Sequence, residues 1–179
     1  PHYDSHVGRM SGMLPGLFEN GGVYNHCNAF KIMADCRLGR AEQALSTLHK
    51  MIPDSKDNPV SITGAEPYLF VNCWCMHPSF FTRIWFGWFT GTSAWALRGF
   101  YEGICGLRRE YGGLRVQPCI PGAWKELTLT RTFRGCRYHI HISNTGSGKP
   151  EVTVDGNRLA DTLLPVLNDG QIHEVVVRT

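Results

Sequence analysis

A glycine turn between Glu19 and His26 carries the first side chains whose types and spacing suit ligand chemistry. The stretch reads Glu-Asn-Gly-Gly-Val-Tyr-Asn-His and leads into an expected helix. A carboxylate accepts two directional hydrogen bonds from sugar hydroxyls, and an imidazole donates to an anion when it is protonated or suitably tautomerised. The paired glycines allow a ligand to approach the backbone closely. The alternative is structural: Glu19 caps a helix, and His26 is an interior histidine with satisfied hydrogen bonds.

The second candidate is Thr90-Gly91-Thr92-Ser93, which precedes a long apolar pattern. The first turn of a helix has unpaired N–H groups and the positive end of the helix dipole, so this entry suits phosphate, with the Thr90 or Thr92 hydroxyl as a further donor. The alternative is an ordinary helix cap that holds no ligand.

Three possible metal ligands, Cys73, Cys75 and His77, alternate along one segment and would share one face of an extended strand. Their spacing is not the two-residue gap of common zinc sites, and no second ligand pair follows. We therefore expect no metal here. The surrounding aromatic side chains are either a sugar-stacking wall or core, and the pattern does not separate the two.

Periodicity predicts which elements position these residues. Apolar side chains at helical spacing predict helices over residues 23–38, 40–51 and 92–110. From residue 125 the period changes to two, which predicts strands on either side of a turn at Arg134-Gly135. Two further strands, at 151–154 and 171–178, are marked by Asp-Gly turn pairs. We expect a helical region over residues 1–118 and a small antiparallel β-sandwich over 119–179.

Composition narrows the class of protein. Of the 179 residues, 42% are hydrophobic and 11% aromatic, which excludes a disordered segment. The net charge of +3 is scattered, without the basic run of a nucleic-acid arm or of a surface for anionic membranes, and no apolar run approaches a membrane span. We expect neither nucleic acid nor membrane as a partner.

The cysteines and the chain start carry two more expectations. The seven cysteines are odd in number and irregularly spaced, which favours free thiols and a cytoplasmic location. The chain begins with Pro1 and a turn-rich stretch. We therefore expect that the native N-terminus lies upstream.

Several ordered motifs resemble the end of glycoside hydrolase family 94 phosphorylases, which include cellobiose, chitobiose and laminaribiose phosphorylases. The similarity covers nearly the whole chain. The motifs are FENGGVYNHCNAFKIMADCRLGRAEQALSTLHKMIP, GAEPYLF, FGWFTGTSAW, EGICGLRREYGGLRVQPCIP and WKELTLTRTFRG. The resemblance implies an α+β chain in which part of an (α/α)6 catalytic barrel, residues 1–118, precedes a C-terminal β-sandwich.

The same resemblance implies roles for individual residues. His26 and the Thr90-Gly91 pair would bind inorganic phosphate at one site. Because helical hairpins in a barrel can bring two helix starts to one mouth, we expect His26 and Thr90 to lie within about 12 Å of each other. Glu19 would contact sugar at the cleavage site, and Glu66 and Tyr68 would line the active site. Members of the cellobiose type resemble one another in having Lys before this Glu, whereas this chain has Phe18, so the acceptor sugar stays open.

The family's general acid is an Asp in a Trp-Asn-Asp-rich stretch, and no such stretch occurs in these 179 residues. Asp4 and Asp35 match nothing equivalent. We therefore expect no catalytic residue in this chain and no activity from it alone.

The implied reaction is inverting phosphorolysis of a β-linked disaccharide to an α-sugar 1-phosphate and a free sugar, with no metal or organic cofactor. The family also implies a homodimer. Two alternatives remain: a non-catalytic sugar-binding or scaffold module, and the phosphorylase-like end of a cyclic β-glucan synthase.

Overall fold

The computed structural model describes residues 2–53, 56, 58–66 and 69–179. The chain forms two compact units. The first contains Pro1–Ala34 and Ala44–Gly99, and the second contains Asp35–Gln43 and Phe100–Thr179. These compact units do not test the domain boundary that we expect at residue 118, so that boundary remains a prediction.

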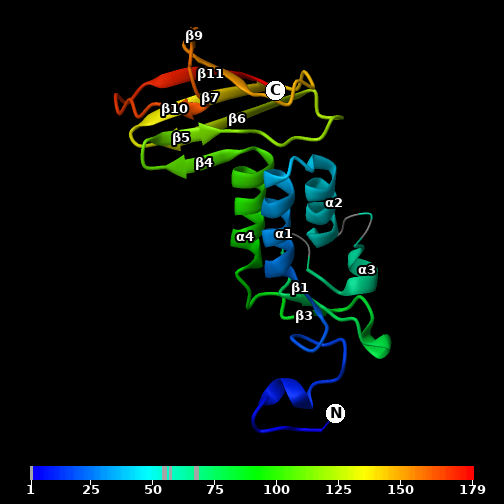
Figure 1. Ribbon diagram of the computed structural model, residues 1–179. Helices are drawn as coiled ribbons and strands as arrows, with labels where there is room; N and C mark the ends of the chain where they lie inside the picture. The colour runs from blue at the N-terminus through cyan, green and yellow to red at the C-terminus, as the bar shows by residue number, and fades with distance from the viewer. Residues whose placement is uncertain (1, 54–55, 57, 67–68) are drawn as a thin grey trace. The chain divides into compact units, whose positions relative to one another are not determined.

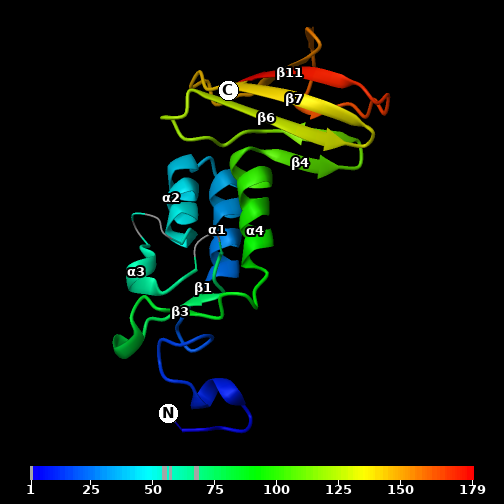
Figure 2. The ribbon, with the colours of Figure 1, turned by 180° about the vertical axis from the view of Figure 1, so that it is seen from behind.

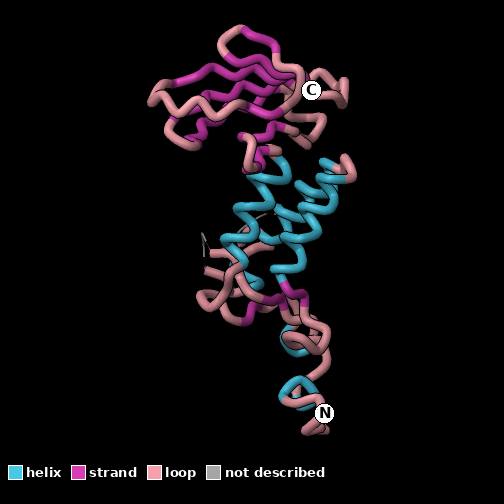
Figure 3. Tube along the Cα trace, turned by 60° about the vertical axis from the view of Figure 1, so that its left-hand side comes forward, coloured by secondary structure: helices cyan, strands magenta, loops and turns pink. Residues whose placement is uncertain are grey.

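Helices dominate the first unit. α1 (Asn25–Arg37) and α2 (Ala41–Met51) confirm two of the expected helices, and Gly39 between them adopts the left-handed conformation (φ 71°) that favours glycine. In Figures 1 and 2, α1 lies beside α2 and α4 (Thr92–Arg98). The short helices are η1 (Arg9–Gly12), α3 (Val60–Thr63) and η2 (Pro78–Phe80). Figure 3 shows that loops connect most of these elements.

A small antiparallel sheet, which we did not predict, leads into α1. Its order is β1 (Val23–Tyr24), β2 (Cys73–Trp74) and β3 (Ile84–Trp85). Trp74 packs in a buried cluster with Ala65 and Val71, against which Val23 and Ile84 also pack. Because β1 ends one residue before α1 begins, this cluster fixes the position of the first turn of α1, which carries His26.

The prediction of a single helix over residues 92–110 is wrong for its C-terminal part. α4 ends at Arg98, a π-helical segment η3 spans Gly99–Ile104, and residues Leu107–Glu110 form strand β4. Gly106 separates η3 from β4 with φ 70°, and a side chain there would overlap the carbonyl group of Gln117. The strand forms because Leu107 pairs with Val116 of β5, a contact that helical periodicity cannot reveal.

The second unit is built on two sheets. In Figures 1 and 2 the smaller sheet, of order β10-β5-β4, lies along one side of the larger sheet, of order β6-β7-β11-β8-β9. β11 runs parallel to β7, so the expectation of a wholly antiparallel sandwich is wrong at this pair. The strands are β5 (Gly113–Val116), β6 (Glu126–Phe133), β7 (Cys136–Ser143), β8 (Glu151–Val154), β9 (Asn157–Arg158), β10 (Leu163–Leu164) and β11 (Ile172–Arg178).

The β6–β7 hairpin follows from local sequence. Arg134 and Gly135 have φ values of 43° and 79°, as a two-residue type I′ turn requires. Alternation along β7 buries Tyr138, Ile140 and Ile142. The described part of the chain is thus a mixed α and β protein, and the (α/α)6 barrel remains a prediction. None of its helices is long and apolar enough to span a bilayer.

Candidate functional site

His26 and Thr90 meet at the start of two helices of the first unit. The Nε2 atom of His26, in the first turn of α1, lies 3.3 Å from Oγ1 of Thr90, two residues before α4. The convergence expected from the sequence is therefore present. His26 is half-buried, and Gly91 is exposed, so the pair is open to solvent on one side.

Thr92 continues this cluster. Its Oγ1 lies 2.6 Å from Oγ1 of Thr90, and its amide donates to the same Thr90 oxygen at 3.0 Å. Thr90 therefore does act as a local cap of α4, as the structural alternative requires, and it also faces His26. Gly91 lies beside the imidazole: a Cβ atom there would be 3.4 Å from His26 Nε2.

Two neighbours of His26 hold its position. The Tyr24 ring stands edge-on to the imidazole, with centroids 4.8 Å apart. Asn25, which is fully buried, donates from its side chain to the Val71 carbonyl at 2.9 Å, and its amide donates to the Asn72 carbonyl. The motif around His26 contains both residues, but their types and spacing in the sequence did not indicate either role.

Glu19 is not paired with His26. Its carboxylate accepts from Arg9 at 3.0 Å, in an exposed ion pair. The paired glycines that follow are approached closely by the chain itself: a Cβ at Gly22 would lie 2.6 Å from Cys73 Sγ and 2.8 Å from the Phe18 backbone. We expected a ligand to approach these glycines closely. At Gly22 it is Cys73 and Phe18 of the chain itself that do so.

Glu66 reaches the segment that carries Thr90. Its Oε1 accepts from the indole N–H of Trp88 at 3.2 Å, two residues before Thr90. The Trp88 side chain is otherwise exposed (73%), and the sequence did not single it out as the partner of Glu66. Tyr68 lies outside the described residues.

The cysteine segment shows no metal site. Within the described part of the chain, no group of three His, Cys, Asp or Glu side chains is arranged to hold a metal ion. Cys73 and Cys75 are fully buried. Burial raises the pKa of the Cys73 thiol to about 11 and also raises that of Cys75. Neither thiol is poised as a nucleophile near neutral pH.

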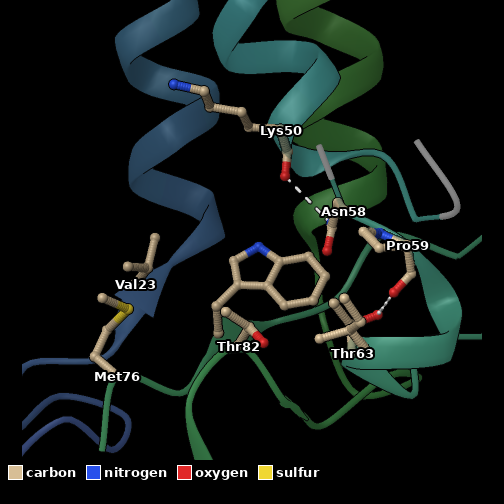
Figure 4. A pocket seen from close by; sticks show the side chains of 9 residues that line it. Val23, Lys50, Asn58, Pro59, Thr63, Met76 and Thr82 are labelled. Carbon is tan, nitrogen blue, oxygen red and sulfur yellow. Dashed lines mark hydrogen bonds between the residues drawn. The ribbon is translucent and has the colours of Figure 1, made fainter. Parts of the chain in front are cut away.

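A separate hollow of about 280 Å³ is lined by residues from the end of α2, from α3 and from strands β1 and β2 (Figure 4). Two of its polar side chains are bonded to the backbone: Asn58 donates to the Lys50 carbonyl at 3.3 Å, and Thr63 donates to the Pro59 carbonyl at 3.1 Å. None of the predicted site residues that the structure describes lines it, and its remaining lining consists of Val23, Ile62, Trp74, Met76 and Thr82.

Known proteins resemble both parts of the chain. Residues 1–106 match the model of the glycosyl hydrolase 94 superfamily catalytic domain, and residues 107–149 match that of the glycosyl hydrolase family 65 C-terminal domain. The chain is 37% identical to solabiose phosphorylase of Paenibacillus borealis over 98% of its own length and 23% of that protein. It is 36% identical to 3-O-beta-D-glucopyranosyl-beta-D-glucuronide phosphorylase of the same species, over 96% of the chain and 23% of the relative.

A more distant relative is a different kind of enzyme. Cyclic beta-(1,2)-glucan synthase NdvB of Rhizobium meliloti is 30% identical over 80% of the chain, which covers 5% of that protein. The chain thus spans under a quarter of the length of each of these relatives. The family match covers more than half of the chain and includes both halves of the His26–Thr90 pair. The chain therefore belongs to the glycosyl hydrolase 94 superfamily.

Proposed function

We propose that the protein to which this chain belongs is an inverting glycoside phosphorylase, and that His26, Thr90 and Gly91 bind its phosphate. The observation that carries this proposal is the 3.3 Å contact between His26 and Thr90 at the open start of α4. Such a pair can present an imidazole N–H and a hydroxyl to one anion. The phosphorylases among the relatives support the same reaction class.

The backbone offers a third donor. Among the described residues, no acceptor meets the amide N–H of Gly91. It precedes the first turn of α4, where the helix dipole favours negative charge. An anion at this point can therefore receive hydrogen bonds from the Gly91 amide as well as from His26 and Thr90.

These donors suit phosphorolysis with inversion. In an inverting reaction, an acid protonates the leaving oxygen while the nucleophile attacks the sugar from the opposite face. Here phosphate takes the place of water, and donors fixed before the reaction lower the free energy of bringing a dianion against the sugar ring. Glu19 and Glu66 would contact sugar hydroxyls, and phosphate is a co-substrate rather than a cofactor. We also propose that the general acid lies outside these 179 residues, so that the chain alone is inactive.

The test is phosphate-dependent release of a sugar 1-phosphate by the full-length protein from a panel of β-linked disaccharides. The two phosphorylases reported above are named for different disaccharides at 37% and 36% identity, so the panel must be broad. Hydrolysis that is independent of phosphate, or no turnover of any disaccharide in the panel, would contradict the proposal. Turnover by the purified 179-residue chain would contradict its second part.

The NdvB relative favours one alternative, a cyclic β-glucan synthase. In that case the full-length protein would release cyclic glucans, which mass spectrometry distinguishes from sugar 1-phosphates. A sugar-binding module would bind disaccharide in calorimetry without turnover at any phosphate concentration.

A further inference from the structure

Thr92 is a buried polar residue next to the proposed phosphate donors. Its side chain is fully buried (0% exposed), whereas Thr90 is partly exposed. The two hydroxyl oxygens lie 2.6 Å apart, a short contact for two neutral hydroxyl groups. Within the part of the chain that the structure describes, Thr92 Oγ1 has no other hydrogen-bond partner.

The direction of the bond between the hydroxyls follows from counting protons. A hydroxyl has one proton and two lone pairs. If Thr90 donated to Thr92, the Thr92 proton would be buried without an acceptor, which is strongly unfavourable. The Thr92 hydroxyl therefore donates to Thr90.

Both lone pairs of Thr90 are then occupied. One accepts from the Thr92 hydroxyl, and the other accepts from the Thr92 amide at 3.0 Å. The single proton of Thr90 must therefore point away from Thr92, on the open side where His26 Nε2 lies 3.3 Å away. When that nitrogen carries a proton, as the proposed phosphate site requires, it cannot accept from Thr90, so the imidazole N–H and the Thr90 hydroxyl can both donate to one anion. Thr90 cannot accept a further hydrogen bond, so it can act only as a donor on its open side.

We infer that Thr92 is a positioning residue that fixes the Thr90 hydroxyl as a hydrogen-bond donor for phosphate. This inference rests on the proposed function. An anion accepts hydrogen bonds but repels lone pairs, so a threonine held in the donor orientation binds it without having to reorient first. Thr92 itself does not touch the phosphate, because its side chain is fully buried.

The test compares Thr92→Val, which keeps the side-chain shape, with Thr92→Ser, which keeps the hydroxyl, in the full-length protein. We expect Thr92→Val to raise the KM for inorganic phosphate by about three- to tenfold, as the loss of one neutral hydrogen bond predicts. The KM for the disaccharide should change less than about twofold, because we do not expect the variant to weaken the binding of both substrates equally. Thr92→Ser should restore most of the phosphate affinity.

Thr63→Val is the matched control, because Thr63 is also buried and its hydroxyl also donates within the same unit, to the Pro59 carbonyl. It should lower the midpoint of thermal unfolding and leave the KM for phosphate unchanged. Should Thr92→Val not fold, Thr92→Ala and Thr92→Ser allow the same comparison through the stabilisation that inorganic phosphate gives against thermal unfolding.

Three results would overturn the inference while the proposed function stands: wild-type phosphate KM in Thr92→Val, equal losses in Thr92→Val and Thr92→Ser, or a parallel rise in the KM for disaccharide. A wild-type protein whose rate does not depend on phosphate would overturn the proposed function itself, and the inference with it.

Discussion

The imidazole Nε2 of His26 lies 3.3 Å from the hydroxyl oxygen of Thr90, although 64 residues separate them in the chain. The contact joins the start of α1 to the start of α4 within one compact unit. It places a titratable ring beside a hydroxyl that can only donate on its open side. The first prediction tests whether the two residues act on the same anion.

Replacing His26 with Ala or Thr90 with Val in the full-length protein should weaken phosphate use, by about 1.5–3 kcal/mol for each lost charge-assisted contact. Because both donors contact one anion, the double variant should lose less than the sum of the single losses. The measurement is kcat/KM for phosphate at saturating disaccharide. His49→Gln, which alters an exposed histidine of α2, is the control. Strict additivity, or unchanged phosphate dependence in both single variants, would refute a shared site.

Gly91→Ala should separate phosphate binding from folding. The φ of Gly91 is −86°, which alanine adopts without strain, and the new methyl group would make an ordinary contact of 3.4 Å with His26 Nε2. The methyl group would shield the atom that faces the anion. We expect the KM for phosphate to rise by roughly tenfold or more, as for a lost contact with a charged group, while the thermal unfolding midpoint stays near that of wild type. Unchanged kinetics in a folded variant would argue against an anion beside Gly91.

Gly22→Ala should destabilise the protein, because its Cβ would lie 2.6 Å from Cys73 Sγ and 2.8 Å from the Phe18 backbone. Overpacking of this kind costs about 1–3 kcal/mol. Gly122→Ala is a matched control, since the nearest atom to its Cβ would be 3.9 Å away. Denaturant unfolding of the two variants measures the difference. Equal stability of Gly22→Ala and wild type would show that the turn can relax.

His173 should make the stability of the second unit depend on pH. It bonds to Asp155 at 2.8 Å and to Asp169 at 3.1 Å. The Asp155 carboxylate, followed by Asp169, raises the pKa of His173, and hydrogen bonding lowers the pKa of both carboxyl groups. The contribution of His173 to the free energy of unfolding is complete below its pKa in the unfolded chain, about 6.5. It is lost as pH rises through the raised pKa of the folded state. The carboxylate contributions are complete above about 3.9 and are lost as pH falls through the lowered values.

Thermal unfolding as a function of pH should therefore show the largest contribution of this cluster between about pH 4 and 6.5. His173→Gln should flatten the decline on the alkaline side, and His49→Gln should not. An unchanged pH profile in His173→Gln would show that the two ion pairs contribute nothing measurable.

The thiols should react in the order of their exposure. All seven cysteines are free in the structure, and only Cys27 is exposed. An alkylating reagent applied to the native protein should label Cys27 first. Cys119 should follow before Cys36, because the hydrogen bond between them lowers the pKa of Cys119 and raises that of Cys36. The buried thiols, Cys73, Cys75, Cys105 and Cys136, should be labelled last.

Mass spectrometry of the labelled peptides measures this order. The denatured, unreduced chain should yield about seven reactive groups. A yield of roughly three or fewer would indicate disulfides and would contradict the expected reducing location.

Local sequence alone determined the elements whose signals are short in range. The periodicity of apolar residues, together with helix-stop and turn residues, was enough to predict α1, α2 and the strands β6, β7, β8 and β11. Helical and alternating patterns depend only on residues that are near neighbours in the sequence. The turn at Arg134-Gly135 followed from the same kind of signal, since two adjacent residues must both accept positive φ. Local motifs made His26 and Thr90 candidates, and the family resemblance assigned both to phosphate. The expected barrel predicted only that they lie within about 12 Å of each other, not that they are in contact.

Tertiary structure decided whatever depends on contacts between distant residues. Leu107–Glu110 follows a helical pattern yet forms a strand, because β5 supplies its hydrogen-bonding partners. β11 lies parallel to β7 because it enters the sheet between β7 and β8, which its own residues do not encode. The Thr92 hydroxyl is defined as a donor only by its burial and by the 2.6 Å contact with Thr90. Burial and hydrogen-bond direction are properties of the folded surroundings, so no pattern of neighbouring residues could have revealed them.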